Sequence, residues 1–412
     1  MSESSDNIAL INCLPVETFL EILLRIDGPT LIRCRRVCKT WMDVIDGSDN
    51  IWHELCKNEF KTSSNLAKKK CGDLSNWYHI YRNLKLWPDV TTYEKTVKEF
   101  YNFNLRDRSH VLDINYGILP LKDSEGTVFY DMAHLKYIPV ALPERNCVKI
   151  CNNDTVSVLL VKKGIIYVQR TVNDPTFECE KTFIADNFIL SDDLLHFYKN
   201  RDVFKCNLLK KDLSSSLIYH SNYEIKELQF NNDIIYLFTD CGKILCIDEN
   251  SVVEKPINCP IEWVKHIKNI CAIDDRNFIC YSRNLFKIET NDYQHLYLDF
   301  PPITALFFYI DMVLIGLRSG EILLYKLSSQ KKASMPIFET LTVLPDEKFP
   351  VQLDVCERKS GPVIVASTFF ELFLIEINFF PDEHMVKNTF TSNKMNLYKR
   401  LRKLKDILQT GD

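Results

Sequence analysis

Apolar residues recur at steps of three and four through the first sixty residues, and this spacing predicts three short amphipathic helices. The first helix begins near Pro15, because the missing N–H of proline costs nothing in a first turn, and the second follows Pro29. The apolar stripes are Phe19, Ile22, Leu23 and Ile26; Leu31, Cys34, Val37, Cys38, Trp41 and Ile45; and Ile51, Trp52, Leu55 and Cys56. Residues 74–103 resume this spacing after a polar break, so we expect a helical spacer there.

From about Arg108 the pattern changes to short runs of apolar, β-branched and aromatic residues separated by Asp, Asn, Ser or Gly, which predicts β-strands. The runs recur as a group, because the layout of residues 225–247 is repeated at 303–325. A period of about forty residues built from short strands is typical of a β-propeller with four-stranded blades. Seven blades are expected, since candidate first strands lie near residues 111, 148, 184, 225, 264, 303 and 351.

The last predicted element is a helix over residues 393–409 with a leucine stripe and basic flanks. The stripe is Leu397, Leu401, Leu404 and Leu408, and the flanking cations are Lys399, Arg400, Arg402, Lys403 and Lys405. Three interpretations stay open: the stripe packs against a neighbouring domain, the cations contact an anionic membrane surface, or they form a nuclear targeting patch.

Two short groups of residues in the N-terminal helices stand out, Leu-Pro-x-Glu at 14–17 and Val-Cys-Lys-x-Trp at 37–41. At this separation they resemble an F-box, and the resemblance covers residues 10–55. It implies binding to a Skp-type adaptor, which connects to a cullin and a RING subunit. The adaptor-facing or supporting residues that it implies are Leu14, Pro15, Ile22, Leu31, Val37 and Trp41.

The apolar stripe of these helices is also wider than three short helices can cover. Three helices of this length cannot bury it among themselves, so a partner surface is expected. The alternative is that the stripe packs wholly on the second domain. Cys38 lies on the stripe, where a buried core thiol is expected.

The repeats resemble WD repeats in period and strand pattern, although the Gly-His and Trp-Asp signatures are missing. F-box proteins with similar propellers read phosphorylated segments through arginines at the turn between the second and third strands. The resemblance places at such turns Lys162, Lys163, Arg201, Arg283 and Arg318. Converging cations would suit a phosphate or carboxylate, so a phosphorylated or acidic protein substrate is expected. The alternative is that exposed turns are commonly basic and that these cations never meet.

These patterns predict a multidomain chain, α followed by all-β. The expected parts are an F-box at 8–60, a helical linker at 61–105, a WD-like propeller at 106–380, and a C-terminal tail at 381–412 that contains the basic amphipathic helix.

Composition narrows the function classes. A formal charge of −4 over 412 residues excludes the strongly basic footprint of a nucleic-acid binder. The longest apolar run, 303–317, contains Asp311 and is too short for a membrane span. The 15 cysteines are irregularly spaced without a CxxC pair, so we expect reduced thiols in a cytosolic or nuclear protein.

No motif in the chain predicts catalysis. It contains no GxxxxGK[ST], GxGxxG, GxSxG or HExxH, and its histidines are dispersed, so no cofactor, metal or catalytic residue is expected. The sequence predicts a non-catalytic substrate-recognition subunit of a Skp–cullin–F-box ubiquitin ligase, whose propeller binds the substrate to promote its ubiquitination. One alternative is an F-box scaffold without substrate turnover, and another is an enzyme with an unrecognised site in the propeller channel.

Overall fold

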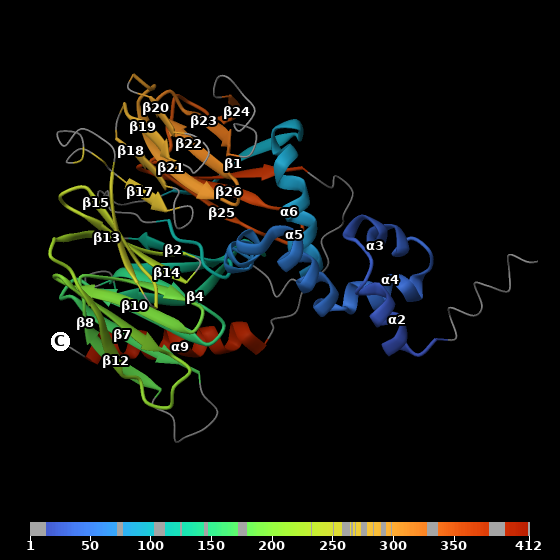
Figure 1. The fold of residues 1–412 in the computed structure, drawn as a ribbon, viewed down its shortest axis with the longest axis horizontal. Helices are drawn as coiled ribbons and strands as arrows, with labels where there is room; N and C mark the ends of the chain where they lie inside the picture. The colour runs from blue at the N-terminus through green and yellow to red at the C-terminus, as the bar shows by residue number, and fades with distance from the viewer. Residues whose placement is uncertain are drawn as a thin grey trace, which may run out of the picture.

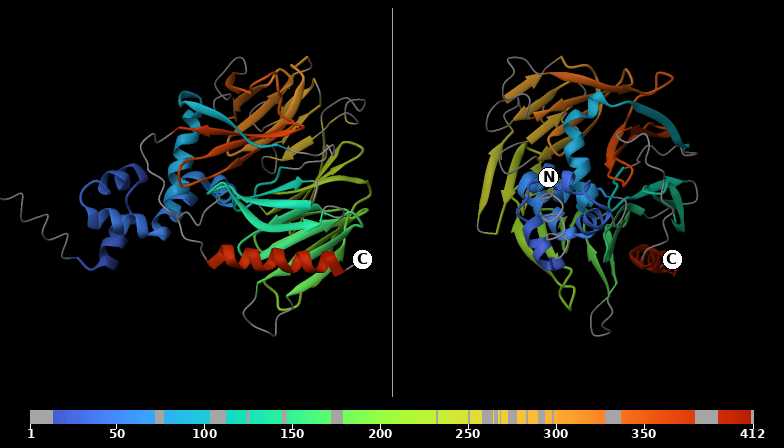
Figure 2. Two further views of the ribbon diagram at one scale, coloured as in Figure 1. Left: turned by 180° about the vertical axis from the view of Figure 1, so that it is seen from behind. Right: turned by 90° about the vertical axis from the view of Figure 1, so that its right-hand side faces the viewer.

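The computed structural model describes residues 14–71, 77–102, 112–123, 126–143, 147–171, 179–231, 233–249, 251–257, 264, 267, 269–272, 278–282, 284–289, 294–297, 299–327, 337–378 and 392–410. It shows N-terminal helices followed by seven β-sheets that form a seven-bladed propeller (Figure 1). In the right-hand view of Figure 2 the sheets surround the N-terminal helices, which lie in front of the centre of the ring. The expected fold class and number of blades are confirmed.

The N-terminal helices project from one side of the propeller (Figure 1). Local sequence explains where α3 begins, because the Asp27 carboxylate accepts the N–H of Thr30 at 2.8 Å and Pro29 occupies the first turn. The helical elements are α2 (Val16–Leu23), α3 (Gly28–Cys34), α4 (Lys39–Gly47), α5 (Asp49–Lys69), α6 (Trp77–Leu86), the 3₁₀ helix η1 (Trp87–Thr92) and α9 (Ser392–Thr410).

Within each sheet the strands are antiparallel, and they follow one another in the chain except where the ring closes. Blade by blade they are β2 (Ile118–Asp123), β3 (Gly126–Asp131) and β4 (Lys136–Pro143); β5 (Cys147–Asn152), β6 (Val156–Val161), β7 (Ile165–Arg170) and β8 (Glu180–Ile184); β9 (Asn187–Ser191), β10 (Leu194–Lys199), β11 (Asp202–Asn207) and β12 (Ser215–His220); β13 (Ile225–Asn231), β14 (Ile234–Thr239), β15 (Lys243–Ile247) and β16 (Val252–Pro256); β17 (Asn269–Ala272), β18 (Phe278–Tyr281), β19 (Phe286–Glu289) and β20 (Gln294–Tyr297); β21 (Ile303–Tyr309), β22 (Met312–Leu317), β23 (Glu321–Lys326) and β24 (Phe338–Val343); and β25 (Gln352–Cys356), β26 (Val363–Ser367), β27 (Glu371–Ile377) and β1 (Lys95–Asn102).

The second strand of several blades is apolar almost without interruption. Every residue of β6, β22 and β26 is buried, since both faces of these strands lie between neighbouring blades. Gly316 in β22 permits a close approach, because a Cβ atom there would lie 2.4 Å from the Cγ atom of Pro350. The continuous apolar runs that marked the repeats are therefore the cores of the blades.

The ring is closed by β1, the strand that precedes the first blade. β1 pairs antiparallel with β27 and forms the outermost strand of the seventh blade. The helical spacer expected over 74–103, and the helical linker expected over 61–105, are therefore wrong for this segment. Val97, Phe100 and Tyr101 fit helical spacing, yet they fit a bulged strand equally well, and pairing with β27 decides between the two.

The first blade has three named strands in the described part of the chain, and the segment before β2 runs along their inner side. Asn115 forms an antiparallel bridge with Ile118 across a tight turn. The N–H of Ile114 donates to the Asp354 carboxylate on β25 at 2.7 Å, which places this segment beside the neighbouring innermost strand. The anchor expected near residue 111 lies just outside the described residues.

The C-terminal helix α9 packs on the first two blades, as the first of the three interpretations expected. Its leucine stripe shares an apolar cluster with residues of β4, β5 and β6. Arg400 is buried as well: it donates to the carbonyl oxygen of Asn153 at 2.6 Å and to the Ser157 hydroxyl at 3.0 Å, and burial lowers its pKa to about 10. Arg400 is thus a structural contact and not a surface cation.

Replacing Leu401 with alanine tests the role of α9. Leu401 is completely buried, so the Leu401→Ala variant should lose about 2–5 kcal/mol of unfolding free energy in urea titrations. Lys403→Ala, on the exposed side of the same helix, is the matched control and should change stability by less than about 0.5 kcal/mol. Equal effects of the two substitutions would show that α9 does not dock as described.

Candidate functional site

Helices α2, α3 and α4 enclose a small apolar core. Phe19, Leu23, Leu31 and Ile45 are buried, and the ring of Phe19 lies 4.8 Å from that of Trp41 between centroids. Leu31 is completely buried, so among the residues predicted to face the adaptor it can act only as a support.

Several large apolar side chains of this domain remain exposed to solvent. Their exposed fractions are Val16 54%, Ile22 45%, Leu24 44%, Val37 57% and Met42 37%, and we call them the exposed apolar set. Side chains of this kind on so small a domain are typical of an interface that a partner covers.

The structure separates the predicted adaptor residues by exposure. Ile22 and Val37 belong to the exposed apolar set and Pro15 is also exposed, whereas Leu14 and Trp41 are half-buried. Cys38 is exposed, so the expectation of a buried core thiol is wrong: it precedes α4 in an extended conformation, outside the helical stripe. Sequence spacing missed Val16, Leu24 and Met42, because periodicity shows which residues are apolar but not which of them remain uncovered.

The small helices are held on α5 and α6 by close contacts. A Cβ atom on Gly28 would lie 1.8 Å from the Tyr81 hydroxyl, so only glycine lets α3 approach α6 this closely. The Arg35 guanidinium donates to the Asp46 carboxylate at 2.7 Å and lies over the ring of Tyr78, 4.1 Å from its centroid. These contacts fix the orientation of the helical domain relative to α6.

The two faces of the propeller differ in what lies over them. Strands alternate in direction within a blade, so the turns after first and second strands emerge on opposite faces. The end of α5 contacts the face on which the turns after first strands emerge. There the N–H of Tyr116 donates to the carbonyl oxygen of Lys69 at 2.7 Å, and the N–H of Glu357 donates to the carbonyl oxygen of Lys70 at 2.9 Å. We call this side the linker face. The opposite side, the far face, carries the turns after second strands at Lys162–Gly164, Asn200–Arg201, Arg318–Gly320 and Thr368–Phe370.

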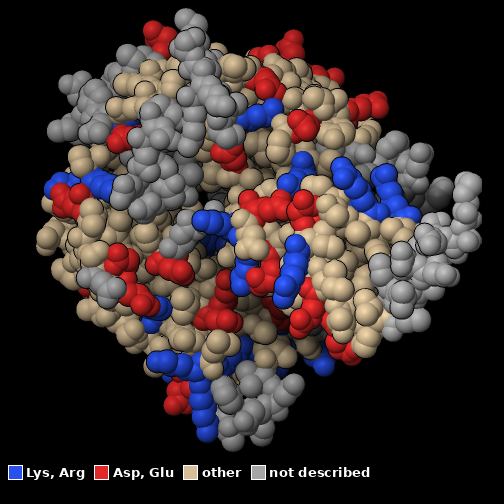
Figure 3. All heavy atoms as spheres, turned by 45° about the vertical axis from the view of Figure 1, so that its right-hand side comes forward, with Lys and Arg blue, Asp and Glu red and all other residues tan. Residues whose placement is uncertain are grey.

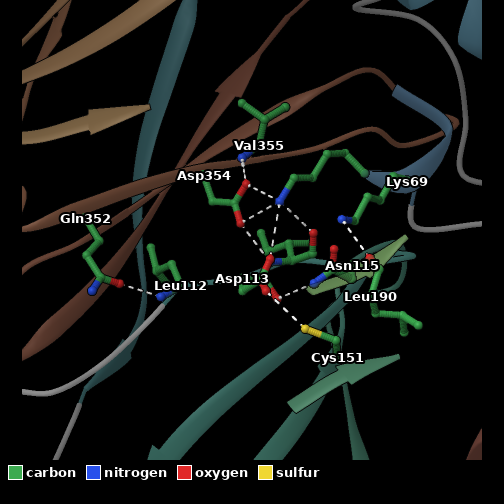
Figure 4. A network of polar contacts seen from close by, with 11 residues as sticks. Lys69, Leu112, Asp113, Asn115, Cys151, Leu190, Gln352, Asp354 and Val355 are labelled. Atoms are coloured by element: carbon green, nitrogen blue, oxygen red, sulfur yellow. Dashed lines mark hydrogen bonds and ion pairs between the residues drawn. The ribbon is translucent and has the colours of Figure 1, made fainter. Parts of the chain in front are cut away.

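Lys70, the residue after α5, anchors this helix to Asp113 and Asp354, the two carboxylates labelled in Figure 4. Its ammonium group lies 2.8 Å from the Asp354 carboxylate and 3.8 Å from that of Asp113, and it donates to the carbonyl oxygen of Ile114 at 2.8 Å. Burial lowers the pKa of Lys70, but the two carboxylates outweigh burial and hold the pKa above its ordinary value. Lys69 donates to the Leu190 carbonyl oxygen on the third blade at 3.4 Å, so adjacent lysines hold opposite sides of the ring.

Glu357 fastens α6 and η1 to the seventh blade. Its buried carboxylate accepts hydrogen bonds from the Trp87 indole at 2.6 Å, the Tyr309 hydroxyl at 2.6 Å and the Asn83 amide at 2.8 Å. Burial raises the pKa of Glu357 despite these three donors. The network joins residues far apart in sequence into one rigid contact between linker and propeller.

The cations predicted for substrate binding lie on the far face wherever the structure describes them. Lys162, Lys163, Arg201 and Arg318 are exposed, and their side chains form no ion pair or hydrogen bond with a described residue. They come from the second, third and sixth blades, and no contact between described residues brings them together. Arg283 lies outside the described residues.

The chain resembles known proteins in two ways. Residues 11–58 match the model of the F-box-like domain. Similar solved structures include the WD40 β-propeller domain of Doa1 (10% identity, 69% of this chain, 97% of that chain, TM-score 0.47), the N-terminal domain of Nup159 (11%, 68%, 95%, 0.43) and Hsv2 of Kluyveromyces lactis (12%, 61%, 86%, 0.41). Likeness at this level says nothing about what the propeller binds. No curated protein compared with the chain is significantly similar to it.

The chain thus carries an F-box-like domain followed by a seven-bladed propeller, a combination typical of non-catalytic adaptor proteins. Within the described ranges, no group of three His, Cys, Asp or Glu side chains could hold a metal ion. No described helix has both the length and the apolar character that crossing a bilayer requires. On the side shown in Figure 3, basic and acidic side chains lie intermixed among uncharged ones, without a broad field of one sign.

Replacing Lys70 with alanine should loosen the helices from the propeller. The substitution leaves the Asp354 carboxylate, 1% exposed, without its cation, and such a loss costs about 3–5 kcal/mol of unfolding free energy. Lys57→Ala is the matched control, since its side chain is 57% exposed and pairs, among the described residues, only with Glu54, so the change should stay below about 0.5 kcal/mol. Urea unfolding measures both. A Lys70→Ala variant as stable as Lys57→Ala would contradict the anchoring role.

Proposed function

We propose that this chain is the substrate-recognition subunit of a Skp–cullin–F-box ubiquitin ligase. The observation that carries the proposal is the exposed apolar set on a domain that matches the F-box-like model. A Skp-type adaptor would cover this set and so remove its apolar surface from water. Through the adaptor, the cullin and RING subunits would be joined to the chain.

The architecture suits the transfer of ubiquitin by proximity. The anchored helices lie on the linker face, which leaves the turns of the far face available to a substrate. A substrate held there would present its lysines at high effective concentration to the ubiquitin-loaded conjugating enzyme on the ligase. The chain itself supplies binding and orientation, and the catalytic groups belong to its partners. A cytosolic or nuclear site of action accords with this role.

The cations of the far face would receive the substrate in this proposal. Lys162 and Lys163 on the second blade and Arg201 on the third lie on neighbouring blades, with their side chains exposed. They would attract a phosphorylated or acidic segment, and Arg318 lies apart from them on the sixth blade.

Substitutions in the exposed apolar set test adaptor binding without disturbing the fold. The double variant Ile22→Ser and Val37→Ser should co-purify at least about tenfold less Skp-type adaptor than the unchanged chain, because buried apolar anchors dominate interface energies. Val252→Ser with Val253→Ser removes exposed apolar side chains from β16 instead and should leave adaptor binding unchanged. If the first variant retains full adaptor binding and a native unfolding transition, the proposed interface is wrong.

A further inference from the structure

One sector of the far face combines exposed aromatic side chains with an acidic loop. Phe369 and Phe370 form the turn between β26 and β27, and Phe370 is 61% exposed, Phe369 37%. The ring of Phe349, in the loop between β24 and β25, packs edge-on against Phe369 with 5.7 Å between centroids. A phenylalanine turn and a neighbouring loop thus form one continuous surface, which we call the Phe370 sector.

The turn that carries Phe370 is held rigidly by Thr368. Its hydroxyl oxygen accepts the N–H groups of Phe370 at 3.2 Å and of Glu371 at 2.9 Å. This local bonding fixes the turn with its aromatic side chain in solvent. Holding an apolar ring exposed in a defined conformation lowers the entropy cost of covering it with a partner.

The neighbouring loop displays carboxylates in a strained backbone conformation. Asp346 and Glu347 have φ angles of 56° and 55°, in the left-handed region that Asp tolerates and Glu seldom adopts, so the strain lies at Glu347. Both are exposed, and the side chain of Asp346 is 79% exposed. The loop therefore presents two negative charges beside the aromatic turn.

Charge in this sector is predominantly negative. Lys348 lies 3.2 Å from Glu371, 3.7 Å from Glu99 and 3.9 Å from Asp346, so its positive charge is more than offset. Arg318 is a further cation nearby, on the adjoining turn of the sixth blade, whose Gly320 lies against the carbonyl oxygen of Lys348. An acidic or phosphorylated segment would be repelled from this sector, whereas a basic one would be attracted.

We propose that the Phe370 sector binds a peptide segment of the substrate in which an aromatic or aliphatic anchor is flanked by Lys or Arg. The anchor packs on Phe370 and the ring pair beneath it, and the cations face Asp346 and Glu347. This inference rests on the proposed function, since it names the class of segment that the far face selects. It adds a site to the exposed cations of the second and third blades.

The test is a selection of random peptides displayed on phage against the full-length chain. Enriched peptides should carry an apolar anchor next to Lys or Arg. Their affinity should fall at least about tenfold for Phe370→Ser, because a central aromatic contact is lost. It should fall about fivefold for the double variant Asp346→Asn and Glu347→Gln, which removes charge at nearly constant size. Leu217→Ser, which removes a side chain 57% exposed on β12, is the matched control and should change nothing.

Three outcomes would overturn the inference: enrichment of acidic or phosphate-mimicking peptides without any basic–apolar ones, equal binding of the basic–apolar peptides to Phe370→Ser, or no enrichment on a chain whose unfolding transition is native. Binding of the purified Skp-type adaptor to the same samples separates this inference from the proposed function. If the chain selects basic–apolar peptides but binds no adaptor, the Phe370 sector is supported and the proposed ligase function is wrong. If the chain binds the adaptor but selects no such peptide, the proposed ligase function is supported and the Phe370 sector is wrong.

Discussion

The ammonium group of Lys70 lies between two carboxylates contributed by different blades, and the placement of every N-terminal element depends on it. A buried cation is tolerated only when an opposite charge lies beside it. A shift of α5 would therefore leave Lys70 or Asp354 buried without its ion-pair partner. Together with the network around Glu357, this contact makes the linker part of the propeller. Because Gly28 and Arg35 then join the small helices to α6, the exposed apolar set keeps a fixed orientation relative to α6.

The segments that precede and follow the seven blades in the chain also contribute to the stability of the propeller. β1 completes the seventh blade, and α9 covers the first two blades with its leucine stripe. By pairing with β27, β1 covers an edge that would otherwise stay open, and an open strand edge invites association with other chains. The segment that leads from the F-box-like domain into the propeller is therefore itself a propeller strand, so the two domains share a continuous structural element.

Sequence patterns predicted the parts of this structure that depend on local periodicity. The period of about forty residues was enough to predict the seven blades. The residue groups around Pro15 and Trp41 were enough to predict the F-box-like domain. The spacing within β1 fits a helix and a strand equally well, and its partner residues lie 269 to 282 positions further along the chain, so local periodicity could not predict the strand. Likewise, Lys70 appeared as one of three consecutive lysines, and only the fold shows that it is buried. Exposure of Val37 and Phe370 could not be predicted, since it depends on what the fold leaves uncovered.

The central claim is that the helical domain binds an adaptor while the far face stays free for a substrate. Hydrogen–deuterium exchange of the full chain with and without the purified Skp-type adaptor tests it most directly. We expect slower exchange in α2, α3 and α4, and unchanged exchange in the turns at Lys162–Gly164, Asn200–Arg201, Arg318–Gly320 and Thr368–Phe370. Protection of those turns, with the helices unchanged, would contradict the account.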